Sequence, residues 1–324
     1  MLNYPFTIRN LKILQAVAEY GNFTEAAQNL YVSQPAISAQ MRELERLLQM
    51  ILIERNKTGS RFTEAGYILL YYANQILALC DEACRALDDL QIYPHNSFTI
   101  GGSQTIGINV LPTLLTSFQL SYPETHINVH IDATWHICWN LTGGDIDLAL
   151  IGGVIPPNLE TQIQTIPFGL EEIVLITSEK NPYASYPSVT KHILYNVHFI
   201  CLEKQSSIQR HVVQKLERIG VYFSDLFVDL EVNSVESLKN FLIGSNKVAF
   251  LSLSSVIKEL RSEELYWIPI KELQIQRPIW VLTNPYRYRL RIIELFLRLC
   301  LIKFSSPTIP VSYTHLTLPT KRIV

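Results

Sequence analysis

The stretch NFTEAAQNLYVSQPAISAQMRELERLLQ, residues 22–49, holds two helical patterns separated by only a few residues. Asn22 is followed three positions later by Glu25, which is close to a capping box. This pattern predicts a helix from Phe23 to about Leu30. The apolar residues that would pack the two helices at an angle are Ala27, Leu30, Val32, Ile37, Met41 and Leu44.

The second helix of this stretch begins in a crowded turn. Ser33 can cap it, and Pro35 falls in its first turn, where a missing N–H costs nothing. The turn sets the register of Gln34, Ser38 and Gln40, which can hydrogen-bond base edges or phosphates. The pair predicts a helix-turn-helix whose second helix enters the major groove of DNA; an αα-hairpin inside an enzyme has the same spacing.

The distribution of charge supports the DNA-binding interpretation, whereas the net charge decides nothing. The whole chain carries −2 at pH 7, but residues 1–62 hold seven basic and five acidic residues. Arg55, Lys57 and Arg61 gather around turn formers just after the two helices. The sequence therefore predicts a basic loop beside the helix-turn-helix.

Residues 63–91 predict one long helix, because they contain no proline and a single glycine. As a helix they would span roughly 40 Å. An apolar stripe of this kind predicts self-association or docking on a neighbouring domain, with an ordinary amphipathic helix as the alternative. The residues that recur at alternating steps of three and four are Leu69, Tyr72, Ile76, Cys80, Ala83, Leu87 and Leu90.

From Phe98 onward, short apolar runs alternate with amphipathic stretches, which predicts an α/β domain with a largely parallel sheet. The expected strands are residues 98–101, 127–131, 148–151, 173–177, 248–251 and 281–283. An amphipathic helix is expected around residues 292–304. The final segment, residues 311–324, fits neither pattern and resembles translated sequencing adapter, so it carries no functional inference.

The composition is that of a soluble globular protein with two or more domains: 324 residues, 48% hydrophobic and 17% charged. No secretory pattern opens the chain and no eighteen-residue apolar run occurs, so neither export nor a membrane span is expected. The five cysteines include no CxxC pair, which predicts free, mostly buried thiols in a reducing compartment.

A second informative stretch is FTIGGSQTIGINVLP, residues 98–112. A strand feeds a Gly-Gly-Ser-Gln-Thr turn that opens toward a helix, where backbone N–H groups and the hydroxyls of Ser103 and Thr105 can hold an anion. The motif is neither a phosphate loop, nor GxSxG, nor a full GxGxxG. A plain strand-to-helix turn is the alternative interpretation.

Two further pairs carry weaker patterns. His126 and His130 lie four apart, but their segment alternates as a strand, which favours a solvated pair over a metal site. Asp145 and Asp147 precede an apolar run and favour a turn that feeds the sheet over paired catalytic carboxylates.

The run from Leu11 to Gly66, with FTEAAQNLYVSQPAISAQMRELE and then LIERNKTGSRFTEAG, resembles the winged helix-turn-helix of LysR-type transcriptional regulators. The resemblance implies a dimerising linker helix and a two-lobed effector-binding domain like periplasmic binding proteins. The implied domains are residues 1–62, winged helix-turn-helix; 63–91, linker helix; 92–310, effector-binding domain with a second lobe at about 169–268; and 311–324, a non-native tail.

The resemblance also assigns the DNA-binding residues. They are Ser33, Gln34, Pro35 and Ser38 at the start of the recognition helix, Gln40 and Arg42 on the backbone, and Arg55, Lys57 and Arg61 in the wing. Ala39 stands where the family often has arginine. Gln49, Ile51 and Ile53 replace the usual glycine, proline and phenylalanine before the wing, which puts the turn geometry there in question.

In this family the first turn of the C-terminal domain lines an effector cleft between two lobes. The residues assigned to the cleft by the resemblance are Ser103, Gln104, Thr105, Thr134, Ile151 and Gly152 from the first lobe and Ser206, Ser207 and Ser234 from the second. Two crossings near Phe168 and Pro269 would form the hinge. No catalytic residue, metal ligand or cofactor is implied, so a non-enzyme is expected.

The segments GGSQTIGINVLP and YVSQPAIS are most similar to the group of this family that regulates RuBisCO operons in cyanobacteria and algal plastids. This implies an effector such as a phosphorylated sugar or NADPH, a homodimer or homotetramer, RNA polymerase as a partner, and location in the plastid stroma, or in the cytoplasm of a bacterium. The alternative is a small-molecule-binding protein or enzyme with a helical N-terminal appendage.

Overall fold

The computed structural model describes residues 4–56, 59–89 and 97–305. Two compact units are present: one runs up to residue 95 and the other comprises nearly all of the chain from residue 96 on. Each is described by itself. The predicted tail at 311–324, and Leu90 and Gln91 at the end of the predicted linker helix, lie outside the described residues.

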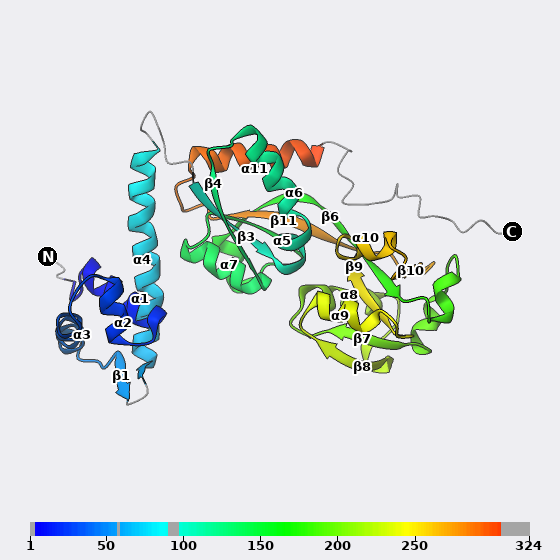
Figure 1. Ribbon diagram of the computed structural model, residues 1–324, viewed down its shortest axis with the longest axis horizontal. Helices are drawn as coiled ribbons and strands as arrows, with labels where there is room; N and C mark the ends of the chain where they lie inside the picture. Colours follow the sequence, from blue (N-terminus) through cyan, green and yellow to red (C-terminus); the bar gives the residue numbers. More distant parts are fainter. Residues whose placement is uncertain (1–3, 57–58, 90–96, 306–324) are drawn as a thin grey trace. The chain divides into compact units, whose positions relative to one another are not determined.

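The first unit is built on the predicted helix pair (Figure 1). Its helices are α1 (Ile8–Tyr20), α2 (Phe23–Asn29) and α3 (Gln34–Leu48). Asn22 caps α2 as predicted, accepting hydrogen bonds from the backbone N–H groups of Thr24 at 3.0 Å and Glu25 at 2.8 Å. The helices share one apolar core, in which Leu14, Ala26, Ile37 and Met41 are at most 1% exposed.

Two short antiparallel strands, β1 (Ile53–Asn56) and β2 (Gly59–Phe62), form the wing. The carboxylate of Glu45 on α3 accepts from the backbone N–H groups of Leu52 at 2.9 Å and Ile53 at 3.1 Å, which ties the wing to α3. Gln49 ends α3 in the left-handed conformation, at φ 53°. The turn is therefore formed although glutamine stands in place of the family's usual glycine, and glutamine disfavours the left-handed conformation.

The linker helix α4 spans Glu64–Asp88, with Thr63 as its N-cap. Its buried face is centred on Gly66, Ala73 and Leu77 and packs on the core of the first unit. Of the predicted seam, Leu69 and Ile76 join that core, whereas Tyr72 is 54% and Leu87 is 67% exposed. The apolar stripe is thus divided between two sides of the helix.

The second unit has two lobes. The first lobe holds strands β3 (Ser97–Ser103), β4 (His126–Asp132) and β5 (Leu148–Gly152) and helices α5 (Gln104–Asn109), α6 (Leu111–Ser121), α7 (Thr134–Gly143) and α11 (Arg291–Ser305). Leu148 and Leu150 of β5 face the core under α6 and α11, while Ala149 and Ile151 face the core under α7. This alternation places helices on both faces of the sheet (Figure 1).

The second lobe has a core of its own. Its elements are β7 (His198–Leu202), β8 (Phe227–Val232), β9 (Val248–Ser252), β10 (Tyr266–Ile268), α8 (Ser207–Arg218), α9 (Val235–Leu242) and α10 (Leu253–Arg261), with short 3-10 turns at Pro182–Ser185, Lys191–Tyr195 and Phe223–Asp225. Leu194, Leu216, Leu242 and Ala249 are fully buried in it. A further 3-10 turn, Pro157–Gln162, belongs to the first lobe, where Leu159 joins the core under α7.

Two long strands join the lobes, β6 (Gln164–Thr177) and β11 (Ile275–Thr283). They pair antiparallel from Ile275 opposite Ile173 to Thr283 opposite Gln164. The strand order β4-β3-β5-β11-β6-β9-β7-β8 therefore runs through both lobes. The largely parallel sheet of the prediction is wrong at its centre, because β11 is antiparallel to β5 and β6 is antiparallel to β9.

Of the two predicted crossings between the lobes, the one near Phe168 is confirmed and the one near Pro269 is wrong; a hinge at the crossings stays a prediction. Phe168 lies on β6 at a β-bulge, because Ile279 pairs with Gly169 and the next residue, Trp280, pairs with Pro167. Pro269 follows β10 inside the second lobe, where its carbonyl accepts from the Val189 backbone N–H at 2.8 Å. The return crossing is made by β11 instead.

Within the described ranges, no helix is both long and apolar enough to cross a membrane. All five cysteines are free; Cys138, Cys201 and Cys300 are buried, whereas Cys84 is exposed. Burial raises the pKa of the Cys138 and Cys201 thiols to about 12, so both remain protonated near neutral pH.

Candidate functional site

The first candidate site is the N-terminal end of α3. Ser33 occupies the N-cap position, but its side chain makes no capping hydrogen bond, so the predicted cap is only positional. Gln34 and Pro35 are exposed. Ser38 is 4% exposed, and its hydroxyl accepts from the Gln34 side-chain amide at 3.0 Å. Gln34 is thus the member of this pair that faces solvent.

Farther along α3, Arg42 is exposed and Gln40 is half-buried. Arg46 is held by Glu43 in a salt bridge at 2.6 Å. Sequence reasoning missed Tyr31, which is 96% exposed in the turn before α3 and has a left-handed backbone at φ 54°. An aromatic ring this exposed can stack on a nucleic-acid base.

The wing carries the remaining predicted cations. Arg61 is exposed on β2, opposite Glu54 in the register of the two strands. The backbone of Arg55 pairs with Ser60 on the neighbouring strand. Lys57 lies outside the described residues. The structure therefore places Arg61 on the wing surface and Arg55 within its hairpin.

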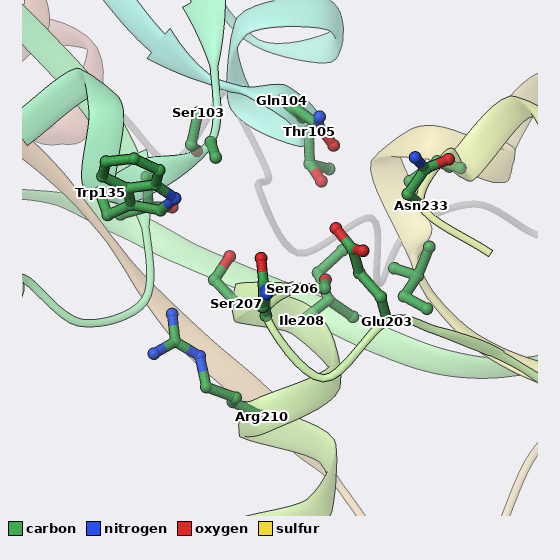
Figure 2. Close-up of a pocket in the computed structure, with 15 residues that line it drawn as sticks. Ser103, Gln104, Thr105, Trp135, Glu203, Ser206, Ser207, Ile208, Arg210 and Asn233 are labelled. Atoms are coloured by element: carbon green, nitrogen blue, oxygen red, sulfur yellow. The ribbon is translucent and has the colours of Figure 1, made fainter. Parts of the chain in front are cut away.

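The second candidate site is a solvent-open cavity between the two lobes of the second unit (Figure 2). Six of the predicted cleft residues line it: Ser103, Gln104, Thr105, Thr134, Ser206 and Ser207. Figure 2 shows the hydroxyls of Ser206 and Ser207 directed toward the side that carries Ser103 and Thr105.

The other predicted cleft residues lie beside or behind this cavity. Ser234 lines an adjoining hollow with Gln104 and Thr105, and its hydroxyl caps α9 by accepting from the Ser237 backbone N–H at 3.3 Å. The backbone N–H of Gly152 donates to the Ser103 hydroxyl at 3.2 Å. Ile151 is fully buried in the first lobe.

Sequence reasoning missed the charged residues of the cavity. Arg210 and Glu203 line it from either side of the α8 N-terminus, and Asn233 lines it from the end of β8. Arg210 lies one helical turn beyond Ser206 and therefore on the same face of α8. Because Ser206 was already a predicted cleft residue, helical spacing could have identified Arg210 as well. Its guanidinium supplies a positive charge for an anionic ligand.

A buried polar cluster lies behind the cavity, formed by residues of β6, β9, β11, α8 and α10. Arg277 of β11 donates through Nε to Glu171 of β6, its partner in the strand register, and both side chains are at most 2% exposed. The Arg277 Nη1 donates to the Ser207 hydroxyl at 2.9 Å. Glu171 also accepts from the hydroxyls of Ser252 and Ser254.

The helix-turn-helix, the linker helix and the two-lobed domain together define a one-component regulator that joins a DNA-reading module to a small-molecule module. Residues 8–67 match the family "Bacterial regulatory helix-turn-helix protein, lysR family" and residues 93–305 match the "LysR substrate binding domain". The chain belongs to the LysR family of DNA-binding transcriptional regulators, a family of non-enzymes.

Among relatives, the chain is similar to proteins called "Probable RuBisCO transcriptional regulator" in several organisms. It is 38% identical to that of Chlorokybus atmophyticus over 309 residues, covering 95% of this chain and 99% of the relative. It is 38% identical to that of Porphyra purpurea, covering 95% and 97%, and 38% identical to that of Trichormus variabilis, covering 95% and 91%.

Solved structures show the same fold. A full-length OxyR variant from Pseudomonas aeruginosa has a TM-score of 0.71 at 19% identity, covering 92% of this chain and 95% of that one. Full-length CbnR, solved with its target DNA, has a TM-score of 0.70 at 20% identity, covering 92% of this chain and all of the other.

Proposed function

We propose that this regulator controls transcription of RuBisCO or other carbon-fixation genes in response to a small-molecule effector bound between the lobes of its second unit. The observation that carries the proposal is the similarity, over 95% of the chain, to three proteins named as RuBisCO regulators. The cavity lined by Ser103, Thr105, Ser206 and Ser207 supplies the place for the effector.

The cavity chemistry favours an anionic metabolite. Its lining carries the Glu203 carboxylate and, beside it, the hydroxyls of Ser103, Thr105, Ser206 and Ser207 and the guanidinium of Arg210. The hydroxyls and the guanidinium can hold phosphate or carboxylate oxygens without offering a nucleophile and base pair for catalysis. A phosphorylated sugar or NADPH fits this inventory and would report on the state of carbon fixation.

Effector control requires that the ligand bind two conformations of the regulator with different affinity, because equal affinity shifts no equilibrium. A change in the angle between the lobes would supply the two conformations. The crossing strands β6 and β11 support this, because a bulge interrupts their pairing near Phe168. The exposed apolar residues of α4, including Tyr72 and Leu87, support a homodimer or homotetramer. RNA polymerase is the expected partner of an activating form.

The relatives set the expected location. Chlorokybus atmophyticus and Porphyra purpurea are algae, and Trichormus variabilis is a cyanobacterium. We place the regulator in the plastid stroma if the source is an alga, and in the cytoplasm if it is a bacterium.

The test is fluorescence anisotropy of the full chain with DNA from upstream of the RuBisCO operon of the same genome, and with scrambled DNA of equal length, over a series of salt concentrations. Saturable binding that favours the upstream DNA is expected, with log K falling by about 0.9 per phosphate neutralised for each unit of log salt. Equal binding to both DNAs would refute the RuBisCO assignment while keeping a DNA-binding protein. Loss of all DNA binding would refute the regulator itself.

A further inference from the structure

Arg277 lies behind the effector cavity and does not line it. Its side chain is 1% exposed, yet one guanidinium nitrogen reaches Ser207, which does line the cavity. Arg277 also belongs to β11, one of the two strands that join the lobes. It is therefore placed to connect the hinge strands with the ligand site.

The guanidinium is held in one position by its surroundings. Glu171 accepts from Nε, and Glu171 is itself fixed by the hydroxyls of Ser252 and Ser254. Gly152 covers the guanidinium: a Cβ on Gly152 would lie 2.8 Å from the Cζ of Arg277 and 2.9 Å from Nη2. A buried ion pair with this many partners keeps its geometry, because separating it leaves an uncompensated charge.

This arrangement determines which way the Ser207 hydroxyl acts. Its oxygen accepts from Arg277, so its single O–H is left to donate in another direction. Across the cavity, the Ser103 oxygen accepts from the Gly152 backbone N–H, which leaves the Ser103 O–H to donate as well. Two hydroxyls, one from each lobe, are thus set as donors.

We infer that Arg277 is a positioning residue for effector binding, acting through Ser207 to make that hydroxyl a donor to a phosphate or carboxylate oxygen of the effector. The inference rests on the proposed function, in that an effector binds between the lobes. Beyond that function, the inference says that a phosphate or carboxylate group of the effector lies at the α8 end of the cavity. It also says that Arg277, outside the cavity, determines the preference for such a group.

The experiment titrates the full chain with inorganic phosphate and measures binding by isothermal titration calorimetry. Ser207→Ala should weaken phosphate binding about tenfold, the effect of losing a hydrogen bond to a charged group. Replacing both members of the ion pair, as Glu171→Met with Arg277→Met, should preserve the fold, because apolar replacement of a whole buried pair is tolerated. It should weaken phosphate binding by a similar factor.

The decisive comparison adds Ser207→Ala to the double Met variant, where it should change phosphate affinity less than twofold. If the double variant fails to fold, Arg277→Lys replaces it as the background in which Ser207→Ala is tested. This variant keeps the charge but loses the planar fork of the guanidinium. Ser224→Ala, an exposed serine bonded to Asp225 in the same lobe, is the matched control and should bind phosphate like the wild type.

An equal loss from Ser207→Ala in both backgrounds would overturn the inference, because Arg277 would then not act through Ser207. A wild-type chain that does not bind phosphate in this titration would overturn the oxyanion assignment. Neither result would contradict the proposal that the protein regulates RuBisCO genes. That proposal is tested separately, by the preference for upstream DNA in the absence of phosphate.

Discussion

Replacing Gly152 by alanine should destabilise the second unit, although the backbone at this position accepts alanine. Gly152 ends β5 and its φ lies outside the left-handed region. The added Cβ would lie 2.8 Å from the Cζ of Arg277 and 3.0 Å from its Nε. Real Cβ atoms do not approach so closely, so the guanidinium must move. It cannot move freely, because Glu171 holds it.

The magnitude follows from three contributions to the free energy of unfolding. Gly→Ala at a compatible backbone position stabilises by about 0.4–1 kcal/mol through the unfolded chain. Overpacking opposes this with about 1–3 kcal/mol. Separating the Arg277–Glu171 pair would cost about 3–5 kcal/mol. The net loss should be about 1 kcal/mol if the pair shifts as a unit and about 3 kcal/mol if it separates.

Tryptophan fluorescence isolates the relevant unit, because all four tryptophans, Trp135, Trp139, Trp267 and Trp280, lie in the second unit. A loss of about 1 kcal/mol should lower its Tm by roughly 2–4 °C, and a loss of about 3 kcal/mol should lower it by roughly 6–12 °C. Gly143→Ala is the control, since its Cβ would meet only the Asp145 carboxylate at 3.6 Å. A Gly152→Ala chain that melts at or above the wild-type Tm would refute the packing argument.

Three further results are expected. Gln49→Gly should stabilise the first unit by about 0.5–1 kcal/mol, because Gln49 is held at φ 53°, where glycine has no steric penalty. Calorimetry of the full chain measures this change, and a lower transition temperature for the first unit would contradict it. Arg42→Gln should reduce the slope of log K against log salt by about 1 if Arg42 contacts a phosphate, as anisotropy with upstream DNA would show, and an unchanged slope would exclude that contact. Burial, with nearby cations adding to it, lowers the pKa of His211, although the imidazole bonds to the Gln276 carbonyl at 2.9 Å. The folded protein therefore binds this proton less readily than the unfolded chain, so stability is full above about pH 6.5 and falls as the pH drops toward the folded pKa. Urea unfolding at pH 7.5 and 5.5 should show a smaller loss for His211→Gln than for the wild type, and equal losses would contradict the assignment.

Local chemistry explains why the helix-turn-helix could be predicted. Asn22 caps α2 through the two N–H groups that its spacing to Glu25 indicates. Ser33 shows the limit of this reasoning, because its position at the N-cap did not guarantee its hydrogen bond. A cap residue can be located from sequence, whereas the rotamer of its hydroxyl depends on neighbours that sequence does not place.

The cavity was largely predictable for a topological reason. Parallel strands of an α/β sheet end at one edge, so the residues after them, such as Ser103 and Thr134, meet there. The cluster behind the cavity was not predictable, because Glu171 and Arg277 come together only through the antiparallel pairing of β6 with β11. Each crossing strand looks like an ordinary apolar run, and nothing local specifies its partner or its direction.

The sequence predicted that the linker helix exists, but it did not predict which face of the helix packs on the core of the first unit. Spacing alone gave one seam through Leu69, Tyr72 and Ile76, but the packed face is centred instead on the small residues Gly66 and Ala73. Small residues let a helix approach its neighbour closely, and a count of apolar positions undervalues them. Gly66 is the extreme case, because a Cβ there would overlap the Leu52 carbonyl oxygen.

The antiparallel pairing of the two crossing strands has a consequence for protein engineering. The chain leaves the first lobe along β6 and returns along β11, so Leu170 and Pro278 face each other in the strand register. The whole second lobe is therefore an insertion between two neighbouring positions of a hairpin. A short turn joining β6 to β11 at this point would excise that lobe while leaving the cores under α6, α11 and α7 uninterrupted, and the same junction would accept a foreign domain in its place.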